Sequence, residues 1–140
     1  MKYDFDKLTR LISELNNSLS LLKDVSIMDL NRFQRDPHRV SSAKYNFIVA
    51  IESVIDICNH LISKNGYRVP EDYADTFRVM AENNILSENF TDTLIKMAKF
   101  RNRLVHLYWK VDTEIIFSIL QNNMGDFDEF LSKLNEFINE

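Results

Sequence analysis

The segment Arg101-Asn102-Arg103-Leu104-Val105-His106 combines the two groups that cleavage of RNA without a metal ion requires. An arginine is permanently charged and can bind a phosphate through two parallel hydrogen bonds. A histidine can accept and donate a proton near neutral pH, as attack by a 2′-hydroxyl demands. The Arg-x4-His spacing also occurs by chance in helices, so its neighbourhood has to supply the specificity. We interpret Arg101 and His106 as candidate catalytic residues.

A helical projection separates this segment into two faces. At about 100° per residue, five apolar side chains gather within about 140° and predict the core-facing stripe: Leu94, Met97, Phe100, Leu104 and Leu107. Asn102 and His106 are one turn apart on roughly the opposite side, so His106 should point away from the core of its helix. Arg101 is displaced from His106 by about 140°. A shared site therefore requires the reach of arginine, a distorted turn, or a second copy related by two-fold symmetry.

The charge around the motif favours a phosphate ligand. Every charged residue between positions 93 and 111 is basic: Lys96, Lys99, Arg101, Arg103 and Lys110. The whole chain has a formal net charge of −4, which does not suit nucleic-acid binding over its entire surface. A short basic patch fits a small site that engages a few phosphates, with Lys99 and Arg103 as candidate phosphate-binding residues. A solvated helical face that happens to be basic is the alternative.

Residues 100–112, Phe-Arg-Asn-Arg-Leu-Val-His-Leu-Tyr-Trp-Lys-Val-Asp, resemble the motif of HepT-like toxins, which are minimal members of the HEPN superfamily. The run Asp56-Ile57-Cys58-Asn59-His60-Leu61-Ile62 looks like the central helix of that family. Gly66-Tyr67-Arg68-Val69-Pro70 and Tyr73-Ala74 look like the loop that follows it. The resemblance covers roughly residues 35–137, and the first 35 residues match less well.

The resemblance implies an all-α, HEPN-type helical bundle, with four main helices plus shorter ones, that forms a symmetric homodimer. It implies a metal-independent endoribonuclease without a cofactor, the toxin of a toxin–antitoxin system, with RNA as its substrate. The implied antitoxin is an MntA-like nucleotidyltransferase that silences the toxin by AMPylation of the motif tyrosine. Carried over to this chain, Arg101 and His106 are catalytic, Asn102 is supportive and Tyr108 is the acceptor. On the helical projection Tyr108 lies within about 20° of Arg101, at the border of the phosphate site.

Length and composition agree with one soluble domain over residues 1–140. Apolar residues make up 45% and charged residues 27% of the chain, and two glycines and two prolines favour long helices with few connections. With two glycines the glycine-rich phosphate loops are impossible. The single cysteine, Cys58, excludes an internal disulfide and lies in an apolar run, which favours packing. We find no signal peptide and no apolar stretch expected to cross a membrane, so we expect a cytoplasmic protein.

Helix signals divide the chain into seven segments, and no segment alternates as a strand would. Residues 5–22 form an amphipathic helix, and Ser26 or Asp29 caps a short one to residue 33. Asp36-Pro37 begins a long central helix that Gly66 ends. Helices are further expected over residues 71–83, from Ser87 to about residue 109, from Asp112 to residue 123, and over residues 126–139, with a break at Gly125.

Three interpretations remain open at this level. The polar seam of the central helix, Glu52, Asp56, Asn59, His60 and Ser63, is either a solvated strip or the lining of a dimer cleft. In the second case Asp56 or His60 would orient the catalytic groups, whereas a metal site on this seam is the least favoured reading. Trp109 and Tyr108 suit base stacking, although packing is the more common role of a helix-end tryptophan. For the whole chain, the alternative function is a catalytically inactive helical module that serves as partner or substrate of a nucleotidyltransferase.

Overall fold

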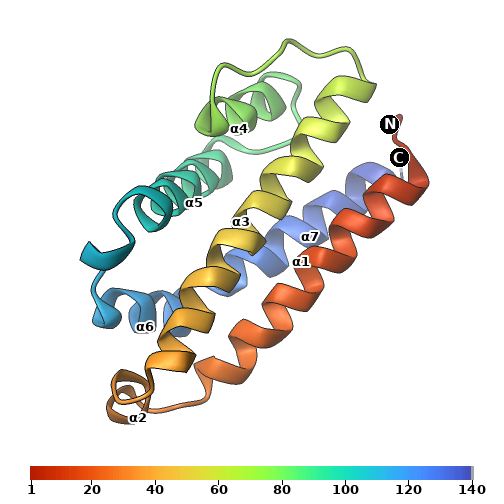
Figure 1. Ribbon diagram of the computed structural model, residues 1–140. Coiled ribbons are helices and arrows are strands. Elements are labelled where there is room, and N and C mark those ends of the chain that lie inside the picture. The colour runs from red at the N-terminus through yellow and green to blue at the C-terminus, as the bar shows by residue number, and fades with distance from the viewer. Residues whose placement is uncertain (140) are drawn as a thin grey trace.

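The computed structural model describes residues 1–139 as an α-helical bundle, without a strand in that range (Figure 1). In chain order the elements are α1 (Phe5–Ser26), α2 (Leu30–Gln34), α3 (Pro37–Lys64), α4 (Tyr73–Glu82), α5 (Glu88–His106), the 3-10 turn η1 (Tyr108–Lys110), α6 (Thr113–Asn122) and α7 (Gly125–Ile138). Helices α1, α3, α5 and α7 are the long ones. The expected all-α fold of four main helices plus shorter ones is confirmed.

Side-chain caps explain where most of these helices begin. The carboxylates of Asp29 and Asp36 and the hydroxyl of Ser87 each accept a backbone N–H of the first turn, as predicted, which stabilises each helix by about 1 kcal/mol. Gly66 follows α3 with a φ of +68°, a conformation that glycine adopts without strain, and the predicted end of the central helix is confirmed.

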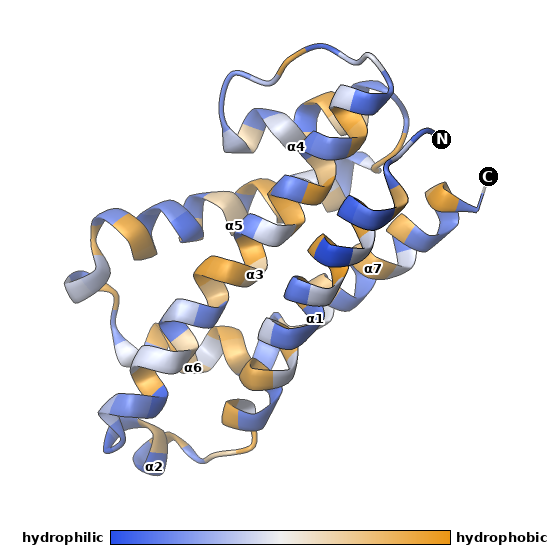
Figure 2. Cartoon of the chain, turned by 45° about the vertical axis from the view of Figure 1, so that its right-hand side comes forward, coloured by the Kyte–Doolittle hydropathy of each residue, from blue (hydrophilic) through white to orange (hydrophobic). Residues whose placement is uncertain are grey.

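The central helix α3 is the core element of the bundle. Its side chains are buried against α1 on one side and against α4, α5 and α6 on the others. Figure 2 shows α3 hydrophobic over most of its middle, whereas α1 alternates between hydrophobic and hydrophilic residues. Length and composition alone would let α3 cross a membrane, contrary to our expectation that no segment would. However, 67% of its most apolar window is buried inside the bundle, so packing accounts for its composition.

The motif helix α5 ends earlier than predicted. Its last residue is His106, and Leu107 leaves the helical conformation with φ −129° and ψ 37° before the 3-10 turn begins. Leu94 and Leu104 are buried as the projection predicted, but Leu107 is exposed because it lies beyond the helix end. Gly125 also differs from expectation, since it is the first residue of α7 rather than a break before it.

Candidate active site

His106 occupies the exposed end of the motif. It is the last residue of α5, and among residues 1–139 its imidazole makes no hydrogen bond or ion pair. Asn102, one turn earlier, is exposed on the same side of the helix. The prediction that His106 points away from the core is confirmed. The imidazole is therefore free to meet a substrate hydroxyl.

Arg101 has the opposite environment, because its side chain is only 15% exposed. Its Nε and Nη2 donate to one carboxylate oxygen of Glu52 on α3, at 3.0 and 2.7 Å. Its Nη1 donates to Oδ1 of Asn102 at 3.1 Å. The motif segment contains no acid, but the fold brings one to it from 49 residues away. Glu52 thus neutralises and orients the candidate phosphate-binding cation.

An aromatic ring covers the Arg101 guanidinium. Its central carbon lies 4.8 Å from the ring centroid of Tyr73, the first residue of α4, in a cation–π contact. Three helices therefore fix this side chain: α3 through Glu52, α4 through Tyr73 and α5 through Asn102. The sequence alone predicted no contact of Glu52 or Tyr73 with Arg101. One signal was present, because Arg101 follows Leu94 by seven residues, two turns along the buried side of α5.

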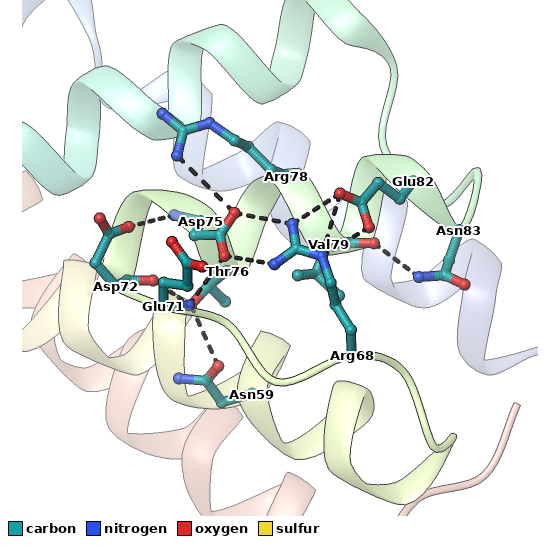
Figure 3. Close-up of polar contacts among 10 residues, drawn as sticks. All are labelled: Asn59, Arg68, Glu71, Asp72, Asp75, Thr76, Arg78, Val79, Glu82 and Asn83. Atoms are coloured by element: carbon teal, nitrogen blue, oxygen red, sulfur yellow. Dashed lines mark hydrogen bonds and ion pairs between the residues drawn. The ribbon is translucent and has the colours of Figure 1, made fainter.

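A polar network anchors the loop and helix that carry Tyr73 (Figure 3). The guanidinium of Arg68 donates to both carboxylate oxygens of Asp75, at 2.6 and 2.9 Å, and to Glu82 at 2.7 Å. The Asp75 carboxylate also accepts the backbone N–H of Glu71 at 2.9 Å. The hydrogen bonds from Arg68 have the largest effect and that from the Glu71 N–H the next largest, and together they hold the pKa of the Asp75 carboxyl well below its usual range. The start of α4 is thereby tied to the loop that precedes it.

One chain does not bring Arg101 and His106 into contact. The guanidinium is held against α3 and α4, and no hydrogen bond joins it or Asn102 to His106 within residues 1–139. The long side chain of Arg101 therefore does not bridge the roughly 140° that separates it from His106 around the helix. A regular helix connects the two residues, so no distorted turn brings them together either.

Tyr108 does not lie where the helical projection placed it. Because α5 ends at His106, Tyr108 belongs to the 3-10 turn, and the predicted alignment with Arg101 is wrong. Lys44, a buried residue of α3, donates from Nζ to the Tyr108 carbonyl at 3.0 Å. The same ammonium lies 4.5 Å from the centroid of the Tyr108 ring. Lys44 thus fixes the half-buried tyrosine in place.

The remaining basic residues of the segment face solvent. Lys99, Arg103 and Lys110 are exposed, and none has an acidic partner among residues 1–139. Trp109 is 91% exposed, so the expectation that it packs is wrong. The exposed surface around His106 therefore combines cations with an aromatic ring.

The polar seam of α3 divides between two neighbours. Glu52 contacts the motif, whereas Nε2 of the buried His60 accepts the backbone N–H of Asp4 at 2.9 Å. Burial, with Lys7 and Lys64 nearby, lowers the pKa of His60, which favours the neutral ring that this hydrogen bond requires. Asp56 lines a surface hollow between α1 and α3 beside His60. Among residues 1–139 neither side chain makes a hydrogen bond or ion pair with the motif helix, and the hypothesis that Asp56 or His60 orients the catalytic groups across a dimer cleft stays a prediction.

Two other candidate chemistries can be compared with the structure. Cys58 is fully buried, and burial raises the pKa of its thiol, so its predicted packing role is confirmed. Over residues 1–139 no three His, Cys, Asp or Glu side chains gather in a way that could hold a metal ion. The described side chains offer no ligand set for one.

Comparison with known proteins shows the family of the chain. A family model described as "Ribonuclease HepT-like" matches residues 15–134. The mRNA nuclease HepT of Shewanella oneidensis is 30% identical over 103 residues, which cover 74% of this chain and 77% of that protein.

Solved structures show the same fold. The tri-AMPylated HEPN toxin of Shewanella oneidensis in complex with the MNT antitoxin matches with a TM-score of 0.84 and 26% identity, over 92% of this chain and 96% of that one. A crystal structure of a toxin–antitoxin with AMP-PNP matches with a TM-score of 0.86 and 25% identity, over 94% and 98% of the two chains. The family model spans most of the sequence, and the chain therefore belongs to the HepT-like ribonuclease family, as its motif indicated.

Proposed function

We propose that this chain is the toxin of a toxin–antitoxin pair and acts as a metal-independent endoribonuclease. The observation that carries the proposal is the Arg-x4-His segment itself. It presents an unpartnered imidazole at His106, an oriented guanidinium at Arg101, and exposed cations that have no acidic partner among residues 1–139. The mRNA nuclease activity named for the Shewanella oneidensis relative supports the same reaction.

In the proposed mechanism, His106 moves protons at the 2′-hydroxyl and at the leaving oxygen. Arg101 stabilises the negative charge that develops on the phosphate in the transition state. It has five N–H donors, of which three are used by Glu52 and Asn102, so two remain for phosphate oxygens. Lys99 and Arg103 bind neighbouring phosphates of the RNA.

The active form is proposed to be a symmetric homodimer. Arg101 and His106 are held apart in one chain, and a two-fold partner can place its own motif opposite this one. Val105 and Leu107, at 40% and 46% exposure, give the motif an apolar border that a partner would cover. Sedimentation at micromolar concentration should give about twice the chain mass. A monomer that still cleaves RNA would exclude the shared site.

The proposed partner is an MntA-like nucleotidyltransferase antitoxin that AMPylates Tyr108. The tri-AMPylated relative in complex with its antitoxin supports this regulation. Tyr108 follows His106 by two residues, so added AMP would put bulk and negative charge beside the cleavage site and repel RNA. Tyr108→Phe should resist silencing, as intact mass after incubation with the enzyme, ATP and magnesium would show. Adducts that persist in this variant would remove Tyr108 from the mechanism.

A single assay tests the nuclease against the inactive binding module. Purified protein, placed with RNA in excess EDTA, should cleave it, because neither His106 nor Arg101 needs a metal ion. Absence of cleavage together with AMPylation by the antitoxin would favour the inactive module. We expect the protein in the cytoplasm, where cellular RNA is present.

A further inference from the structure

We propose that Trp109 is a nucleobase-binding site, on which one base of a single-stranded RNA stacks next to the scissile phosphate. This inference rests on the proposed nuclease function and adds the form of RNA that the site accepts. Trp109 is 91% exposed, the highest value among the large apolar side chains of the described chain. A tryptophan left this open is unusual, because burying it would remove a large apolar surface from water.

The indole is exposed on a supported turn rather than on a loose end. The 3-10 turn is closed by a hydrogen bond from the Lys110 N–H to the Leu107 carbonyl at 2.8 Å. Lys44 holds the carbonyl of Tyr108 at 3.0 Å. The Tyr108 and Trp109 rings meet at nearly right angles, with centroids 5.2 Å apart. An aromatic group that is already oriented loses little freedom when a base stacks on it.

The position of Trp109 matches a nucleotide beside the cleavage site. It follows His106 by three residues, so their Cα atoms are at most about 11 Å apart. Arg103 and Lys110, both exposed, flank it along the chain. Aromatic rings interleaved with basic side chains are the usual surface for single strands, where cations follow the backbone and rings stack with bases.

This geometry selects single-stranded RNA over a duplex. In a duplex both faces of each base are covered by neighbouring bases, and only an unstacked base can place its face on an indole. Stacking is also tolerant of sequence, because every base has a π-face. Trp109 is therefore expected to set the form of the substrate rather than its sequence.

The test uses a favourable property of the chain: Trp109 is its only tryptophan. Tryptophan fluorescence of the protein should fall, in a saturable way, when a 2′-O-methyl oligoribonucleotide that cannot be cleaved is added. The same oligonucleotide annealed to its complement should quench far less at equal phosphate concentration. Equal quenching by the duplex, or none by the single strand, contradicts the proposal.

Kinetics with cleavable single-stranded RNA provide the second measurement. Trp109→Ala should raise KM about tenfold, within the range measured for one base–aromatic stack, with kcat changed far less. Trp109→Phe keeps an aromatic ring and should give a KM between those of the wild type and of Trp109→Ala. Phe5→Ala is the matched control, because Phe5 is an aromatic with 70% exposure that begins α1. Figure 1 shows the start of α1 far from the turn that follows α5.

The outcomes separate this site from other roles and from the nuclease proposal. If Trp109→Ala leaves KM unchanged but weakens the dimer or antitoxin binding, Trp109 is a protein contact and the base site is wrong. If RNA is cleaved normally without quenching, the base site fails and the nuclease assignment stands. If the single strand quenches fluorescence but no RNA is cut in EDTA, the nuclease assignment fails and the base site stands.

Discussion

The two ends of the Arg-x4-His segment differ in what surrounds them. Arg101 is enclosed: Glu52 binds two of its nitrogens, Asn102 binds a third, and the Tyr73 ring covers its face. His106 is open and has no hydrogen-bonding partner within the described residues. A group that stabilises charge acts best when it is oriented before the substrate arrives. A proton-transfer group has to be reachable by the hydroxyl that it serves.

This contrast predicts which substitutions should affect contacts with other helices. Changes near Arg101 alter contacts made by α3 and α4, whereas changes at His106 alter only the contacts of the exposed surface with a ligand. At the arginine end, activity should therefore depend on residues that are far away in the sequence. At the histidine end, it should depend on few residues other than His106 itself.

The largest effect is expected at the open end. His106→Ala should lower the cleavage rate by about 10²- to 10⁴-fold, the usual contribution of a positioned acid or base. Helical content and dimer mass should stay unchanged, because the exposed side chain makes no contact that holds the bundle. Circular dichroism and sedimentation provide the control. Loss of either signal would show that His106 is structural.

A smaller but still large loss is expected at the enclosed end. Arg101→Lys keeps the charge but loses the planar group that reaches Glu52 and Asn102 together. The cleavage rate should fall by about 10²-fold, as when one preorganised donor is removed from a transition-state site. Single-turnover rates at saturating RNA measure it. Wild-type rates in the lysine variant would reduce Arg101 to a generic cation.

Glu52→Gln tests whether the enclosure matters. The glutamine keeps one acceptor for Arg101 but removes the charge, and kcat should fall about tenfold, as expected for weakening a charged hydrogen bond. KM should not rise, since a negative charge beside the RNA phosphates is lost. Asp56→Asn is the matched control one turn further along α3, because among residues 1–139 Asp56 makes no hydrogen bond or ion pair with Arg101. A higher kcat in Glu52→Gln would mean that Glu52 restrains Arg101 instead of positioning it.

The boundaries of most helices could be predicted because their signals are local. Asp36-Pro37 and Ser87 cap through side chains three residues from their partners, and Gly66 takes a conformation that suits glycine. The end of α5 carried no such signal, since no glycine or proline lies between His106 and Gly125. The predicted end of α5 is three residues too late, so Tyr108 and Trp109 lie outside the helix in which they were expected. The predicted direction of Tyr108 failed because a projection holds only for a regular helix.

The site was predicted where one helix determines it and missed where tertiary contacts do. The outward direction of His106 follows from the period of α5. The partners of Arg101 do not, because Glu52 lies 49 residues away and Tyr73 begins another helix. Helical periodicity says which residues of a helix face the core, but it does not say which residue of a second helix faces them.

The smallest effect on activity is expected two contacts away from Arg101, at the network that anchors α4. Arg68→Gln removes both ion pairs to Asp75 and Glu82, so Tyr73 should cover Arg101 less well, while His106 is untouched. A weakened cation–π contact should lower kcat by about two- to fivefold. The matched control is Arg78→Gln, because Arg78 reaches the same carboxylate only at 3.9 Å from an exposed position (Figure 3).

Stability against pH shows whether this network acts as described. The folded-state pKa of Asp75 is lowered by Arg68, so the stabilisation is complete above the unfolded pKa of about 4 and is lost as pH falls through the lower, folded value. The melting temperature of Arg68→Gln should therefore lie below that of the wild type at pH 7, and the gap should narrow below about pH 4. Arg78→Gln should follow the wild type throughout. A constant gap down to acid pH would show that Arg68 stabilises α4 by packing alone, and an unchanged kcat would disconnect this network from Arg101.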